Sequence, residues 1–151
     1  MQNFQGSGFA VNIPEQCQDL SCYTFLLPTD KQYTPQVSIK FDRVSIDEDL
    51  NTFTSRQEMS LLENLEDYKM LNQIEGKQEG RDAIIKTIEW GNKEGRICQQ
   101  LIYLLEKMGS TNRIYTITCT DLAENFSQSR STMNEIVRSF KLSSTHHVKV
   151  A

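Results

Sequence analysis

Three apolar segments in the second half of the chain follow one another with only short polar connections between them. They cover residues 83–88, 97–106 and 113–120 and are rich in the branched and aromatic side chains that favour strands. Residues 92–95 and 109–112 join them, and each connection contains a glycine that lets the chain turn. Because parallel strands need crossovers of about a dozen residues or more, these short connections favour antiparallel pairing.

Four further segments carry strand patterns. Residues 9–13 and 37–41 alternate apolar with polar side chains, which is the period of a half-buried strand. Residues 21–27 are rich in aromatic and branched side chains and stop at Pro28. The more polar segment 68–79 completes the set, so strands are expected on both sides of a central helical stretch.

Two segments have the spacing of amphipathic helices. Ser45 and Glu48 stand at the spacing of a capping box, and apolar residues then recur at helical intervals, which predicts a helix that ends at about Glu66. A second helix is expected after residue 125, with Asp121 or Asn125 as its cap.

These elements together predict an α+β fold, with an antiparallel sheet of about six to seven strands and two main helices. We expect a single domain over residues 1–142 and a flexible C-terminal tail over residues 143–151. Two helices can cover one face of such a sheet well and the other only partly, so part of one face is expected to lie open.

Charge and composition exclude several classes of function. The 151 residues carry 16 Lys and Arg against 20 Asp and Glu, a net charge of −4, and no basic stripe is present. Binding to nucleic acid or to an anionic membrane surface is therefore not expected. The N-terminus shows no signal peptide and no segment is long enough to insert into a membrane, which predicts a cytoplasmic protein with reduced cysteines.

The residues that carry most enzyme chemistry do not form a recognisable pattern. His146 and His147 lie in the expected tail, no Gly-rich phosphate loop joins a strand to a helix, and no CxxC pair is present. We therefore expect no catalytic residues, no metal and no cofactor. A hydrolase that uses Cys22, Cys119 or a pair of carboxylates stays open as an alternative hypothesis.

Short motifs spread over most of the chain resemble those of the DcrB-related family in their order and spacing, from about Phe4 to Leu142. They are Ile13-Pro14; Ser21, Phe25, Leu27 and Pro28; Asp47-Glu48-Asp49-Leu50; Gln99-Gln100-Leu101-Ile102-Tyr103; and Ser139-Phe140-Lys141-Leu142. The resemblance implies a PsbP-like fold. Without a lipoprotein signal, the chain is more similar to the cytosolic Eag-type branch, whose members are often dimeric chaperones of type VI secretion effectors.

The resemblance also implies a function and a partner. Such chaperones shield the apolar N-terminal transmembrane segment of a secreted effector, here called the client. The alternative hypothesis is an adaptor or immunity-like protein that binds a globular partner and has no transmembrane client. Neither hypothesis involves nucleic acid or direct insertion into a membrane, and the first implies a homodimer.

The second predicted strand presents two different sides. We expect Tyr23 and Phe25 to pack under both helices, which leaves Cys22, Thr24 and Leu26 on the open side. The resemblance assigns these three residues to the client groove. It places Gln57, Leu65 and one of Gln99 or Gln100 at the edge of that groove. The simpler alternative is that Leu26 and Leu65 are core residues and that the glutamines are solvated.

Overall fold

The computed structural model describes residues 1–142, so the tail predicted over residues 143–151 lies outside the described residues. Eight strands and two helices make up the described part of the chain. They are β1 (Gln2–Gln5), β2 (Ala10–Ile13), β3 (Cys22–Leu26), β4 (Gln36–Val44), α1 (Leu50–Asn64), β5 (Lys69–Gln78), β6 (Arg81–Trp90), β7 (Ile97–Lys107), β8 (Asn112–Leu122) and α2 (Phe126–Ser139).

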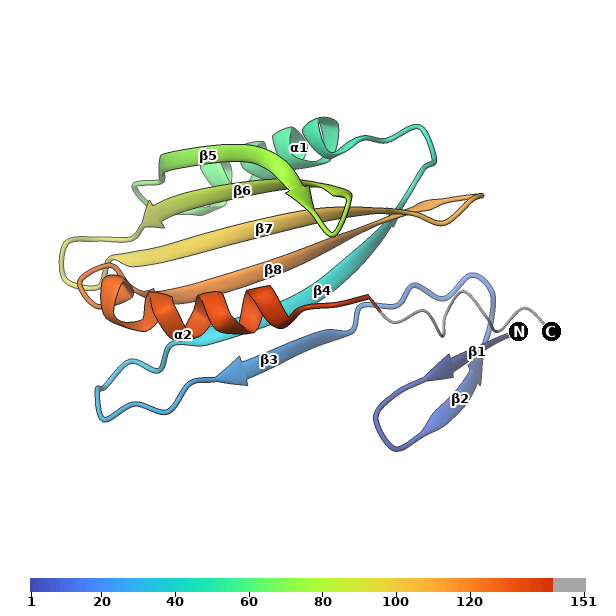
Figure 1. The fold of residues 1–151 in the computed structure, drawn as a ribbon, viewed down its shortest axis with the longest axis horizontal. Coiled ribbons are helices and arrows are strands. Elements are labelled where there is room, and N and C mark those ends of the chain that lie inside the picture. Colours follow the sequence, from blue (N-terminus) through green and yellow to red (C-terminus); the bar gives the residue numbers. More distant parts are fainter. Residues whose placement is uncertain (143–151) are drawn as a thin grey trace.

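Six strands form one twisted sheet in the order β3-β4-β8-β7-β6-β5, and every neighbouring pair is antiparallel (Figure 1). The strands β1 and β2 form a separate antiparallel hairpin beside the end of the sheet where β3 begins. The predicted α+β class is confirmed, with six strands in the main sheet and two helices. The hairpin strand β1 was not predicted.

Tight turns join the strands of the second half, as the short connections predict. Glu79 and Gly80 form the two-residue turn between β5 and β6, and both have positive φ angles, of 52° and 76°. A two-residue hairpin turn of this kind matches the right-handed twist of its strands, and glycine adopts the positive angle without steric cost. This turn fixes the register of β5 against β6.

The two helices lie on opposite faces of the sheet. On one face, Phe126 and Met133 of α2 pack with Ile102 and Ile117, in a cluster that also buries Cys119. On the other face, α1 packs in a second buried cluster; its members on the helix are Leu50 and Phe53, and those on the strands include Ile84, Ile88, Leu101, Tyr103 and Ile114. The expectation that one face carries both helices is wrong. The reason is that β7 is apolar on both of its sides, so each face needs its own cover.

The helix ends differ from the predicted capping pattern. The N-cap of α1 is Asp49, whose Oδ1 accepts a hydrogen bond of 2.8 Å from the Thr52 N–H, instead of Ser45. This bond holds the pKa of the Asp49 carboxyl below its ordinary value. Asn125 is the N-cap residue of α2 but makes no side-chain capping bond, while Asp121 accepts a bond from the Ser129 hydroxyl.

Candidate functional site

The antiparallel register continues each side of β3 across the sheet. Leu101 and Tyr103 of β7 belong to the cluster under α1, so the residues aligned with them lie on the same face, which we call the α1 face. Three rows cross this face from β3 to β7: Cys22, Lys40, Thr116 and Tyr103; Thr24, Ser38, Thr118 and Leu101; and Leu26, Gln36, Thr120 and Gln99. The α1 face therefore includes the three β3 residues that the sequence assigns to the open side.

Small hydroxyl side chains dominate the part of this face between β3 and β7. We call this set the hydroxyl face; it consists of Thr24, Ser38, Thr116, Thr118 and Thr120. The helix α1 packs over β6 and β7, whereas β3 is the edge strand at the far end of the sheet and all its residues are exposed. Leu26 is 66% exposed, so it is not a core residue.

One hydroxyl group of this face is buried without a hydrogen bond. Thr116 is only 6% exposed, and its Oγ1 has no partner in the part of the chain that the structure describes. An unpaired buried polar group costs about 1–3 kcal/mol, so such a group in a native fold calls for an explanation. A neighbouring hydroxyl is satisfied, because Thr120 Oγ1 accepts a hydrogen bond of 3.1 Å from Gln99 Nε2.

The strand register shows which of the two adjacent glutamines lies on the α1 face, beside the hydroxyl face. Gln99 lies on the α1 face, where its Oε1 accepts a hydrogen bond of 3.0 Å from the indole N–H of Trp90. Gln100 pairs with Cys119 and points to the opposite face. The structure thus brings Gln99 together with Cys22, Thr24 and Leu26 and separates Gln100 from them.

Gln57 and Leu65, the two residues expected at the groove edge from the helical segment, occupy different positions in the structure. Gln57 is half-buried one turn after Phe53, whose ring contacts that of Tyr103 with centroids 6.1 Å apart. Leu65 is the C-cap residue of α1 and packs against the apolar cluster beneath the helix. Gln57 therefore lies on the sheet side of α1, and Leu65 contributes to the core that holds the helix in place.

An ion pair with a buried lysine lies beneath α1, and no local sequence pattern indicates it. Lys86 is 2% exposed, and its Nζ donates to the carbonyl of Thr54 at 3.3 Å and to Glu58 Oε2 at 3.4 Å. The hydroxyl of Tyr68 donates to the other oxygen of Glu58, and burial, with the nearby Glu58 carboxylate, raises the pKa of Tyr68 to about 12. This network ties the middle of α1 to β6.

The opposite side of β3 borders an apolar cleft. Tyr23 and Phe25 are each 51% exposed, so they lie at the rim of the α2 face instead of beneath a helix. Together with Ile39, Phe140 and Leu142 they line a cleft of about 330 Å³ beside the end of α2. The two sides of β3 thus border surfaces of different chemistry, one hydroxyl-lined and one aromatic.

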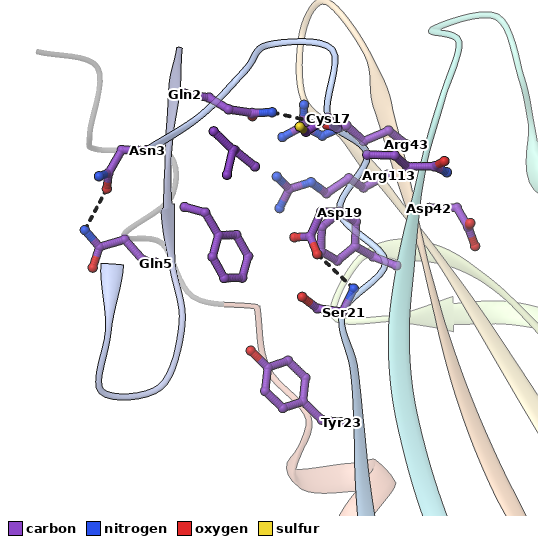
Figure 2. A pocket seen from close by; sticks show the side chains of 14 residues that line it. Gln2, Asn3, Gln5, Cys17, Asp19, Ser21, Tyr23, Asp42, Arg43 and Arg113 are labelled. Atoms are coloured by element: carbon purple, nitrogen blue, oxygen red, sulfur yellow. Dashed lines mark hydrogen bonds between the residues drawn. The ribbon is translucent and has the colours of Figure 1, made fainter. Parts of the chain in front are cut away.

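A larger cleft of about 480 Å³ lies between the β1–β2 hairpin and the end of the main sheet. Its lining includes Arg43 and Arg113 from the sheet, Asp19 from the segment before β3, and amide side chains of the hairpin. Figure 2 shows Arg113 extending toward the hairpin, with Asp19 close by, whereas Asp42 points away. The sequence analysis did not identify this cleft, because its residues are distant along the chain.

The thiols fall into two classes. Cys98 and Cys119 are buried, and burial raises the pKa of each to about 11, so both thiols stay protonated at neutral pH. Cys17 and Cys22 are exposed. Within residues 1–142, no three His, Cys, Asp or Glu side chains are grouped as metal ligands, and no helix is both long and apolar enough to cross a membrane.

Solved structures define the class of fold. A Pseudomonas aeruginosa protein described as a putative regulator of unknown function is 15% identical and superposes with a TM-score of 0.75, covering 95% of this chain and 97% of its own. LpqN of Mycobacterium tuberculosis, involved in cell envelope biogenesis, is 10% identical with a TM-score of 0.58 over 79% of this chain and 82% of its own. The cyanobacterial PsbP protein of Synechocystis is 9% identical with a TM-score of 0.53 over 94% and 92%. The fold is therefore PsbP-like, as the resemblance implied.

The family follows from the sequence model that matches the chain. The model for the DcrB family covers residues 10–139, so the protein belongs to the DcrB family. A comparison with curated proteins finds no match. The family expectation is thereby confirmed, while the chaperone branch within it is a matter for proposal.

Proposed function

We propose that this protein is a non-enzymatic chaperone or adaptor that binds and shields the apolar N-terminal transmembrane segment of a type VI secretion effector. Membership of the DcrB family supports the proposal, together with the resemblance to its cytosolic chaperone branch. An apolar helix in water exposes a surface that promotes aggregation, so a protein that covers it before secretion has a clear physical role.

The chemistry of the hydroxyl face suits a transmembrane helix. Helices in membranes associate through small residues that allow close approach and through hydrogen bonds from Ser and Thr. The face offers Ser and Thr side chains on β3, β4 and β8, with Lys40 and Gln36 beside them on β4 and with Cys22 and Leu26 at its outer edge. It suits a helix whose contact surface is built from Gly, Ala and Ser better than one lined with bulky side chains.

The observation that carries the proposal is the exposed strip of the α1 face along β3, where Thr24 and Leu26 lie open while α1 packs over β6 and β7. A bound helix can pack against these exposed side chains and against the half-buried Ser38 and Thr118 beside them. The Gln99 amide stands in the adjoining part of the face, where it is held in place by Trp90 and Thr120.

A test uses two adjacent residues of β3 that point to opposite faces. The protein is co-expressed with the N-terminal apolar segment of a secreted effector from the same genome, fused to a soluble carrier. Thr24→Arg places an unpaired charge against the client and should reduce co-purification at least about ten-fold, because burying such a charge is costly. Phe25→Arg should leave co-purification unchanged.

Controls separate loss of binding from loss of folding. Asn72→Arg, on the opposite edge strand β5, is a matched control that should bind like the wild type. Circular dichroism shows whether each variant is folded. Wild-type recovery of the client by a folded Thr24→Arg variant would contradict the proposal.

A second candidate function rests on the aromatic cleft. Half-exposed aromatic side chains such as Tyr23 and Phe25 are common anchors of protein interfaces, which favours an adaptor that binds a globular partner. For that function the outcome of the same test reverses: Phe25→Arg abolishes binding and Thr24→Arg does not. Deleting the partner's apolar segment should then leave binding intact. The expected homodimer and its cytoplasmic location belong to the first proposal and can be checked by sedimentation and fractionation.

A further inference from the structure

Two arginines occupy directly opposite positions on neighbouring strands. Arg43 of β4 and Arg113 of β8 are paired in the antiparallel register and lie on the α2 face of the sheet. Like charges that face each other in this way destabilise a sheet. Arg43 is exposed at the edge of this face, whereas Arg113 is half-buried and aligned with Glu106 of β7 on its other side.

The guanidinium of Arg113 is fixed in position. It stacks over the ring of Phe41 at 4.5 Å from the centroid, and its Nη1 donates to the Tyr115 hydroxyl at 3.4 Å. Glu106 is the residue of β7 aligned with Arg113, and its Oε1 accepts a hydrogen bond from the same Tyr115 hydroxyl. The Oε2 of Glu106 lies 3.9 Å from Nη2 of Arg81. Arg113 is thus oriented by an aromatic ring and a phenol.

The arginine pair opens into the cleft under the hairpin. The Nε2 of Gln2 donates to the carbonyls of Pro14 and Cys17, each at 3.3 Å, which closes the hairpin segment over the cleft. Asp19 lines the same space, and its Oδ1 accepts a bond of 2.8 Å from the Ser21 N–H (Figure 2). The cleft therefore presents two cations, one nearby carboxylate and several amide groups.

We propose that this cleft binds an acidic side chain on an extended peptide segment of a partner protein. Arg43 and Arg113 line the same cleft, so a carboxylate that enters it can accept charge-assisted hydrogen bonds from their guanidinium groups. Asp19 can accept a backbone N–H of the same peptide, and the amides of Asn3 and Gln5 match peptide donors and acceptors. A phosphate carries more negative charge than one carboxylate and is disfavoured by Asp19.

The acidic-peptide site is separate from the hydroxyl face. Arg43 and Arg113 lie on the α2 face, whereas the hydroxyl face belongs to the α1 face. A partner bound in the cleft leaves the hydroxyl face free, so this inference stands whether or not a transmembrane client binds there.

The test follows the arginine side chains directly. The Nε–H signals of Arg43 and Arg113 are observed by NMR while the full chain is titrated with the peptide acetyl-Ala-Gly-Glu-Gly-Ala-amide. A matched peptide with Gln in place of Glu, and inorganic phosphate, are titrated in parallel. We expect the Glu peptide to shift both signals and to bind about ten-fold or more tightly than the Gln peptide, since hydrogen bonds to charged groups are the stronger ones.

Variants complete the test. Arg43→Gln removes an exposed side chain and should abolish binding of the Glu peptide without loss of stability, because it removes a like-charge repulsion. Arg138→Gln, an exposed arginine on α2, is the matched control and should bind normally. Equal affinity for the Glu and Gln peptides, absence of shifts at millimolar peptide, or tighter binding of phosphate would each overturn the proposal.

Discussion

The two faces of the sheet are covered by helices in different ways. Beneath α2, the contacts are mainly apolar, with Met133 at 1% exposure in a cluster with Ile117 and Cys119, and the buried Asp121 carboxylate accepts a hydrogen bond from Ser129 of the helix. Beneath α1, the apolar cluster is combined with the buried Lys86–Glu58 pair, and the same face continues into the hydroxyl face. Both faces thus carry an apolar cluster and buried polar groups, but only the α1 face extends beyond its helix into a hydroxyl-lined surface.

The largest expected effect concerns the α2 face. Met133→Ala should lower the free energy of unfolding by about 2–5 kcal/mol, because it leaves a cavity in a closely packed cluster. Urea denaturation followed by circular dichroism measures the change, and Met133→Leu should cost less than about 1.5 kcal/mol. A loss below about 1 kcal/mol for the alanine variant would show that the α2 face is not the tighter of the two.

A smaller effect is expected from the charged pair under α1. Lys86→Met should destabilise the fold by about 1–3 kcal/mol, because the carboxylate of Glu58 loses its partner but is 27% exposed and can still reach water. The double variant Lys86→Met with Glu58→Gln should recover most of that loss in the same denaturation experiment. If the double variant is less stable than the single one, the pair itself stabilises the attachment of α1.

The smallest expected effect has the opposite sign. Thr116→Val keeps the shape of the side chain and removes a buried hydroxyl that has no partner among the described residues, so stability should rise by about 1 kcal/mol. Client recovery in the co-expression assay should stay unchanged, because the Thr116 hydroxyl is covered by the protein's own atoms. Thr87→Val on β6 makes the same substitution at a half-buried position of the α2 face and serves as the control. A fall in stability for Thr116→Val would contradict the expectation that this buried hydroxyl is unpaired.

The sequence predicts the elements of this fold better than their arrangement. Periodicity identifies both helices and the strands β6 to β8 by clear apolar patterns, whereas the segment of β5 is more polar and its strand pattern is weaker. It misses β1, since Gln2–Gln5 contains a single apolar residue and offers no alternation to detect. Periodicity cannot predict that the two helices lie on opposite faces of the sheet, because it does not show which side of β7 each helix covers.

The candidate site likewise combines features that the sequence predicts with features that it does not. Alternation along β3 correctly separates Cys22 and Thr24 from Tyr23, because a strand has a period of two. The choice between Gln99 and Gln100 depends on register, which no local pattern contains. Lys86 was not detected, because a lysine in an alternating strand resembles a solvated residue and only the helix above it makes it buried.

The edge position of β3 has a consequence for how relatives of this protein can diverge. Its odd-numbered and even-numbered positions border separate surfaces, and no residue of the strand is buried between them. Substitutions in one set can therefore accumulate without altering the other. Homologues that keep the same architecture are free to change the chemistry of one surface within this five-residue strand while retaining the other.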